Sequence, residues 1–121
     1  MNRRIIDQLA QELNRGRSSL LQEVAENQEE MRVVIEQQET ELEESAQKDR
    51  ITRVTSRLNE RDQQKIREIN TALDRINVGV YGKCQRCGRE IGIKRPRALP
   101  ATTLCIECAA ARERKREHPK R

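Results

Sequence analysis

Two short cysteine pairs constrain this chain more than any other feature of its sequence. The pairs are Cys84-Gln85-Arg86-Cys87 and Cys105-Ile106-Glu107-Cys108, and 17 residues lie between them. Two residues between cysteines let a tight turn direct both sulfurs at one metal ion, and this repeated spacing is typical of a four-thiolate zinc site. Gly88 follows the first pair and permits the positive φ that such a turn often needs. The sequence therefore predicts one structural zinc ion, with four ligands: Cys84, Cys87, Cys105 and Cys108.

The spacing alone leaves other uses of paired cysteines open: two disulfides, buried free thiols or a redox pair. Disulfides require an oxidising compartment. Residues 1–7 already carry charges, and neither an apolar segment of signal-peptide length nor a membrane-spanning run is present. We therefore expect a cytoplasmic protein without a membrane segment, in which paired thiols bind metal. Four thiolates leave no open position for water, so the zinc is expected to be structural and not hydrolytic.

The composition limits the apolar core that the chain can build. Among 121 residues Tyr81 is the only aromatic side chain, 34% are hydrophobic and 37% are charged. This suits long amphipathic helices joined to a small metal-stabilised module better than a thick globular core. The sequence shows no nucleophile with a partner base, no open metal site and no phosphate-binding glycine loop, so an enzyme is not expected.

Two apolar stripes with helical spacing precede the cysteines. Residues 2–39 contain no proline and only Gly16, where we expect a bend or break. Asn27 falls on this first stripe, where a polar residue can fix the register. The second stripe ends at Asn77-Val78-Gly79, and Gly79 suits a left-handed helix cap. The stripes consist of Ile6, Leu9, Leu13, Leu20, Val24, Met31, Val34 and Ile35, then Ile51, Val54, Leu58, Ile66, Ile69, Leu73 and Ile76.

The two stripes have similar lengths and a polar connection, which favours an antiparallel coiled-coil hairpin. Pairing between two chains in a dimer is the alternative. Thirty-odd helical residues at about 1.5 Å each would reach on the order of 45 Å. The sequence thus predicts a mostly α chain, with a hairpin over residues 1–79, a zinc finger over 80–110 and a basic helix end and tail over 111–121. The tip of the hairpin is expected near residues 40–47.

Charge is unevenly distributed along the chain. Residues 82–121 hold 12 Lys and Arg against 4 Asp and Glu, a net +8, whereas residues 1–81 hold 13 against 16, a net −3. The basic end suits nucleic acid or an acidic protein surface. Around the predicted tip, acidic residues outnumber Lys48. This cluster is either a solvated charged surface or a probe that presents carboxylates to a metal or to a basic surface.

The residues between and after the cysteine pairs are mainly polar and basic. Pro96 is expected to keep residues 94–97 out of a helix, so that they form a basic loop. A helix is expected from Leu104 to Arg116, followed by a frayed basic tail.

The stretch from Tyr81 to Cys108 resembles the zinc finger of the DksA/TraR family. The shared features are the YGxCxxCG start, the IGIxR centre, a proline before the second pair and the LCIxC close. The resemblance is strong over about residues 66–110, and the rest agrees in architecture. It implies a transcription factor that binds RNA polymerase and not DNA. The coiled coil of such a factor enters the secondary channel, and its tip approaches the catalytic magnesium.

The resemblance also assigns the residues of the tip. The family's tip motif is Asp-x-x-Asp-x-Ala, and counting back from Cys84 without gaps places Glu41, Glu44 and Ala46 at its three named positions. The spacing is kept, and both acids are one methylene longer. The resemblance therefore implies that these three residues act at the polymerase, with the protein working as a monomer.

A second departure from the family concerns the nucleotide ppGpp. Basic residues of the family that contribute to a ppGpp site match Glu68, Leu99 and Ala109 here. A tetraphosphate needs cations, so we expect little ppGpp dependence. Nearby cations that are candidate basic contacts are Arg67, Arg95 and Arg97.

Two other functions fit parts of the sequence. The basic C-terminal end favours a zinc finger that binds DNA or RNA through phosphate contacts. A coiled-coil dimer with a metal-stabilised end is a purely structural alternative. Binding to RNA polymerase without sequence-specific DNA binding remains the leading prediction, because the resemblance supports it.

Overall fold

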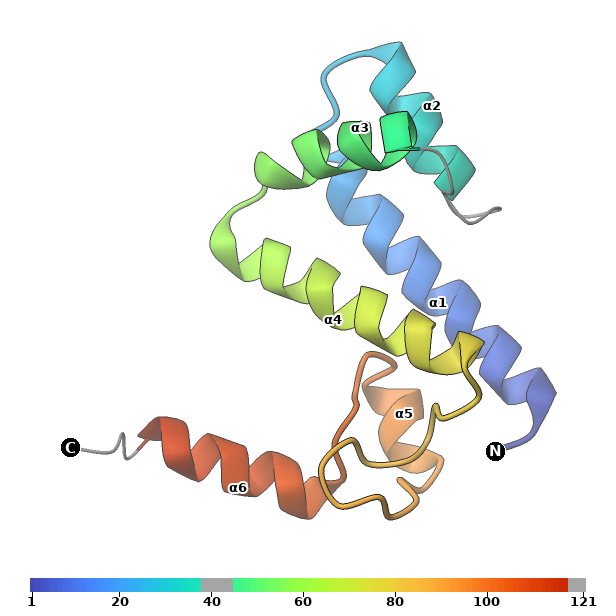
Figure 1. Cartoon of the computed structure of the whole chain (residues 1–121), viewed down its shortest axis with the longest axis vertical. Helices are drawn as coiled ribbons and strands as arrows, with labels where there is room; N and C mark the ends of the chain where they lie inside the picture. The colour runs from blue at the N-terminus through green and yellow to red at the C-terminus, as the bar shows by residue number, and fades with distance from the viewer. Residues whose placement is uncertain (38–44, 118–121) are drawn as a thin grey trace.

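Helices make up nearly all the regular structure of the chain. The computed structural model describes residues 1–37 and 45–117. Within those residues, strand-like pairing is limited to one isolated antiparallel bridge, between Lys83 and Glu90. In chain order the helices are α1 (Arg3–Gln22), α2 (Gln28–Gln37), α3 (Ser45–Ser56), α4 (Glu60–Asn77), α5 (Lys94–Ala98) and α6 (Ile106–Glu117) (Figure 1).

The first four helices form two antiparallel pairs, α1 with α4 and α2 with α3 (Figure 1). Each pair contributes to an apolar cluster. The cluster at the base joins α1 and α4 and consists of Leu9, Leu13, Ile69, Ala72 and Tyr81. The upper cluster joins all four helices and consists of Leu21, Val34, Val54, Leu58 and Ile66. The predicted class is confirmed: a mostly α chain with a helical hairpin, a cysteine-bearing module and a short last helix.

The hairpin is not built from two continuous helices, however. Both arms are interrupted, at residues 23–27 and at residues 57–59. After the first interruption α2 turns back against α1, and the Ser18 hydroxyl donates to the Val34 carbonyl at 3.4 Å. In one straight helix these two residues would be about 24 Å apart. The predicted continuous helix over residues 2–39 is therefore wrong, and so is the long straight arm.

Asparagine side chains explain where both arms break. The Asn27 side-chain oxygen accepts from the Glu30 N–H at 2.9 Å, so Asn27 caps the start of α2. Asn59 caps α4 in the same way, accepting from the Asp62 N–H at 2.8 Å. Asn27 thus ends one helix and starts another, contrary to its predicted place on a continuous stripe. Gly16 lies inside α1, so the break predicted there is also wrong.

Two turn residues near the finger behave differently from each other. Gly79 has φ 80° and lies just beyond α4, where the Val80 N–H donates to the Arg75 carbonyl at 2.9 Å. This is the left-handed helix cap that the sequence predicted. The loop predicted around Pro96 is instead α5, with Pro96 buried. Proline is tolerated there because the first turn of a helix needs no N–H donor.

Two further features bear on location and on the tip. Across the described helices, no segment combines the length and apolar character that crossing a membrane requires. The predicted tip residues Glu41 and Glu44 fall outside the described residues. Ala46 lies in the first turn of α3, whose backbone alone is described at that position.

Candidate metal centre

The first cysteine pair lies on a tight turn that backbone hydrogen bonds close. The Gly88 N–H donates to the Cys84 carbonyl at 2.9 Å, and the Cys84 N–H donates to the Arg89 carbonyl at 2.7 Å. Gly88 has φ 77°, in the left-handed region that glycine enters without strain. The prediction for Gly88 is confirmed, and the turn brings Cys84 and Cys87 to the same site.

The second pair lies where α6 begins. The Cys108 N–H points at the Cys105 sulfur, 3.4 Å away, and the Ala109 N–H donates to the Cys105 carbonyl at 2.9 Å. Backbone N–H groups at a helix start favour a thiolate over a thiol. The Gln85 N–H donates to the Thr103 carbonyl at 2.7 Å, which holds the first turn against the segment that enters the second pair.

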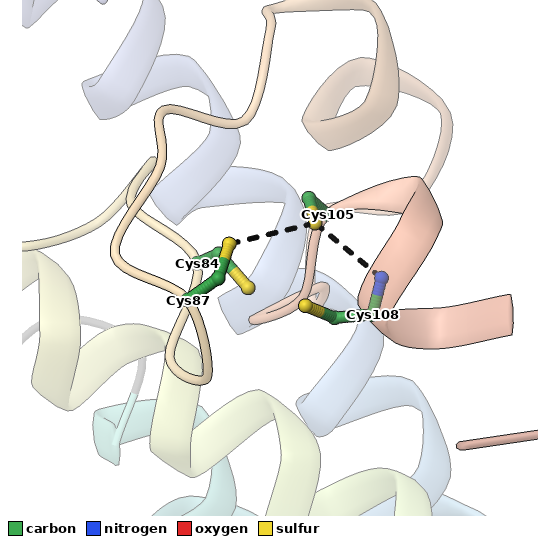
Figure 2. Close-up of side chains that lie close together, drawn as sticks. All are labelled: Cys84, Cys87, Cys105 and Cys108. Carbon is green, nitrogen blue, oxygen red and sulfur yellow. Dashed lines mark hydrogen bonds between the residues drawn. The ribbon is translucent and has the colours of Figure 1, made fainter. Parts of the chain in front are cut away.

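The four sulfurs converge from the two turns (Figure 2). All of them lie within 4.8 Å of one another, and the sulfurs of Cys87 and Cys105 are 3.8 Å apart. A tetrahedral zinc ion with Zn–S bonds of about 2.3 Å keeps its sulfurs about 3.8 Å apart. Disulfide sulfurs would lie about 2.05 Å apart, and all four cysteines are free. The arrangement fits a zinc ion and no disulfide.

The electrostatics of the sulfurs favour a bound cation. Burial raises the pKa of Cys84, but hydrogen bonds from the backbone N–H groups of Cys87, Cys105 and Arg86 outweigh it and lower the value to about 6. The hydrogen bond with Cys105, together with burial, raises the pKa of Cys108 to about 12. One thiolate therefore opposes the ionisation of its neighbours, and a divalent cation removes this repulsion.

Tyr81 connects the finger to the base of the hairpin. Its ring is buried in the base cluster, against α1 and α4. Its hydroxyl donates to the Pro100 carbonyl at 2.8 Å. Burial raises the pKa of Tyr81 to about 12, and the nearby Glu12 carboxylate adds to the effect. Arg75 adds a second connection by donating to the Lys83 carbonyl at 2.8 Å. The finger is thus attached to the hairpin at its base.

The structure brings together the three residues that replace the family's basic ppGpp contacts. Glu68, Leu99 and Ala109 line one recess of about 190 Å³ between α4 and the finger. Arg95 also lines this recess, and its Nε donates to the Leu104 carbonyl at 3.0 Å. Arg112 is the second arginine of the recess, and the sequence analysis did not single it out. Its position one helical turn after Ala109 was the available signal.

The other two predicted basic contacts do not line this recess. Arg67 lies on α4, where its guanidinium donates to the Gln64 side-chain oxygen at 2.6 Å and 3.1 Å. Arg97 lies on α5 and is exposed. Of the three candidate cations, the structure therefore places only Arg95 with the substituted positions.

The cysteine module matches a known family over part of the chain. Residues 79–114 match the Prokaryotic dksA/traR C4-type zinc finger. An uncharacterised protein of Aquifex aeolicus is 49% identical over 49 residues, or 40% of this chain and 34% of that protein. The RNA polymerase-binding transcription factor DksA of Escherichia coli is 37% identical over 54 residues, or 45% of this chain and 36% of that protein. The chain thus matches about a third of the length of these curated relatives.

A solved structure extends the similarity to the helices. The structure of transcription factor DksA2 from Pseudomonas aeruginosa aligns with 97% of this chain and 88% of its own, with 30% identity and a TM-score of 0.59. The chain belongs to the DksA/TraR family. As a DksA/TraR protein with a C4-type finger and four converging cysteines, it carries a structural zinc centre.

Proposed function

We propose that this DksA/TraR protein is a transcription regulator that binds RNA polymerase and places the tip of its hairpin in the secondary channel. The observation that carries the proposal is the alignment of nearly the whole chain with transcription factor DksA2. Cys84, Cys87, Cys105 and Cys108 hold one zinc ion that shapes the base, and the protein acts as a monomer without catalysing a reaction. Glu41, Glu44 and Ala46 are the residues that act on the polymerase active centre.

Charge supports this assignment of roles. The first 81 residues carry a net −3 and the last 40 a net +8. Carboxylates are the side chains that a magnesium-bearing site accommodates, and a basic base suits an acidic protein surface. The zinc centre has no open ligand position for catalysis. Its part in the function is to hold the finger against α1 and α4.

The decisive experiment separates binding from action. The double variant Glu41→Ala/Glu44→Ala should bind purified RNA polymerase within about twofold of the wild type but lose its effect on initiation in transcription assays. Binding should persist because the base provides most of the contact surface, whereas the effect depends on the tip carboxylates. Asp7→Ala removes an exposed acid of α1 and is the matched control, with binding and effect both retained.

Competition with another secondary-channel factor identifies the binding site. We expect this protein and that factor to exclude each other from RNA polymerase. Simultaneous binding would contradict the secondary-channel proposal. Salt-sensitive binding to DNA without polymerase, combined with no polymerase binding, would instead favour the nucleic-acid-binding alternative.

We also propose that ppGpp changes the effect of this protein little. The recess between α4 and the finger holds Glu68, Leu99 and Ala109, none of which supplies a cation to a tetraphosphate. Arg95 is already engaged with the Leu104 carbonyl. Arg112 is left as the main cation that faces the recess.

Transcription of a sensitive promoter with and without ppGpp tests this part. The wild type should respond to ppGpp by less than about twofold, and the double variant Leu99→Arg/Ala109→Lys should respond more strongly, because it adds two cations to the recess. Strong synergy between ppGpp and the wild-type protein would show that the existing arginines are sufficient and would contradict the proposal.

A further inference from the structure

One arginine joins the two interruptions of the hairpin. Arg57 lies in the interruption between α3 and α4, and its guanidinium donates to both carboxylate oxygens of Glu30 at 2.5 Å and 2.9 Å. The same group donates to the Val24 carbonyl at 3.2 Å and lies 3.4 Å from a Glu26 carboxylate oxygen. Val24 and Glu26 belong to the interruption between α1 and α2. A two-pronged pairing of this kind fixes geometry as well as charge.

The Arg57 clamp acts together with an already ordered start of α2. Glu30, the main acceptor, also accepts from the Glu26 N–H at 2.9 Å. The hydrogen bond from Arg57 is the main cause that lowers the pKa of Glu30 to about 2. The carboxylate therefore stays charged at neutral pH and available to the clamp.

Helices α2 and α3 are connected to each other as a unit beyond the two interruptions. Arg50 on α3 and Glu29 on α2 form an ion pair at 3.1 Å. Val34 and Val54 contribute one side chain from each helix to the upper cluster. A movement at both interruptions can therefore carry α2 and α3 together relative to α1 and α4 (Figure 1).

The apolar residues of the first arm fit two different arrangements. At about 100° per residue, Leu20, Val24, Met31 and Ile35 would fall within about 60° of one another on one continuous helix, in line with Leu9 and Leu13. In the bent structure Ile35 is 47% exposed, and the other three are only partly buried.

Val33 shows the opposite behaviour. It is 1% exposed in the bent structure, yet on a continuous helix it would lie on the side away from that stripe. One set of side chains thus suits a straight arm, and a different side chain is buried only when the arm is bent. Neither interruption contains glycine or proline, so both segments are compatible with a helix.

We propose that the hairpin is a two-state device, in which Arg57 holds the bent form described above and its release lets both arms straighten. In the straight form residues 23–27 and 57–59 become helical, the stripe from Leu20 to Ile35 packs against the second arm, and Val33 faces solvent. The reach of the hairpin then grows by about the length of α2, roughly 15 Å. A gain in reach matters for action in the secondary channel, a consequence that rests on the proposed function.

Small-angle X-ray scattering of the zinc-loaded protein tests the two states. Val33→Glu penalises the bent form, and Arg57→Ala removes its clamp. Both variants should lengthen the particle by on the order of 15 Å, with far-UV circular dichroism showing equal or higher helix content. Ile35→Glu penalises the straight form and should leave the particle as short as the wild type. Arg61→Ala removes an exposed arginine from the start of α4 and should change neither measurement.

The result for Val33→Glu distinguishes a second state from simple unfolding. A lengthened particle with lost helix would mean that the distal half has unfolded, and this would overturn the two-state proposal. Unchanged dimensions in both Val33→Glu and Arg57→Ala would overturn it as well. These measurements concern the free protein, so their failure leaves polymerase binding untouched, and a failure to bind polymerase leaves them untouched.

Discussion

The variant Cys84→Ser is expected to lose its zinc ion and the ordered structure of the finger. A serine oxygen is a poor replacement for a thiolate at zinc, and the remaining three sulfurs leave the tetrahedron open. Zinc binding contributes on the order of 10 kcal/mol or more to folding in small zinc fingers. The finger has few buried apolar side chains to replace that energy, among them Ile91. Metal analysis should give about one zinc per wild-type chain and close to none for the variant after dialysis against a mild chelator.

Limited proteolysis should show the structural effect of the same variant. New cleavage is expected in residues 82–105, while α1 and α4 stay partly protected by their own apolar cluster. Arg86→Ser is the matched control, because Arg86 is exposed and lies between the first two cysteines. It should keep its zinc. A Cys84→Ser protein that retained both zinc and protease resistance would contradict the ligand assignment.

The variant Leu9→Ala is expected to lower the free energy of unfolding by about 2–5 kcal/mol. Leu9 is 3% exposed and belongs to the base cluster that unites α1, α4 and Tyr81. Truncation removes buried methyl groups and leaves a cavity that two helices and a ring cannot easily fill. Domains of this size are stable by only about 5–15 kcal/mol, so the loss is a large part of the total. Urea denaturation followed by circular dichroism measures it.

Val78→Ala provides the comparison for Leu9→Ala. Val78 is 73% exposed just beyond α4, and its truncation should change the free energy of unfolding by less than about 0.5 kcal/mol. Equal effects of the two variants would mean that the cluster of α1, α4 and Tyr81 is not the main source of stability at the base.

The features that depend on local chemistry could be predicted from the sequence. The cysteine spacing predicted four converging sulfurs, and Gly79 and Gly88 were predicted where a positive φ is needed. Each of these predictions needs only the residue type and its immediate neighbours. The hairpin pairing also followed from periodicity, since the apolar residues of α1 and α4 repeat at helical spacing.

The interruptions of the arms could not be predicted in the same way. Asn27 lies at a stripe position and can either fix a coiled-coil register or cap a new helix. The choice depends on Arg57, 30 residues further along the chain, which contacts Val24 and Glu30 across the fold. Pro96 was misread for a related reason: a proline excludes a helix interior but not a first turn.

The burial of Tyr81 gives the protein a built-in optical reporter. The chain has no tryptophan and no other tyrosine, so its near-ultraviolet absorbance and fluorescence come from the ring that lies between α1, α4 and the finger. The bond to the Pro100 carbonyl depends on the finger being in place. The emission of a single side chain therefore follows the docking of the finger, while far-ultraviolet signals follow the helices, and the two events can be timed separately in the unlabelled protein.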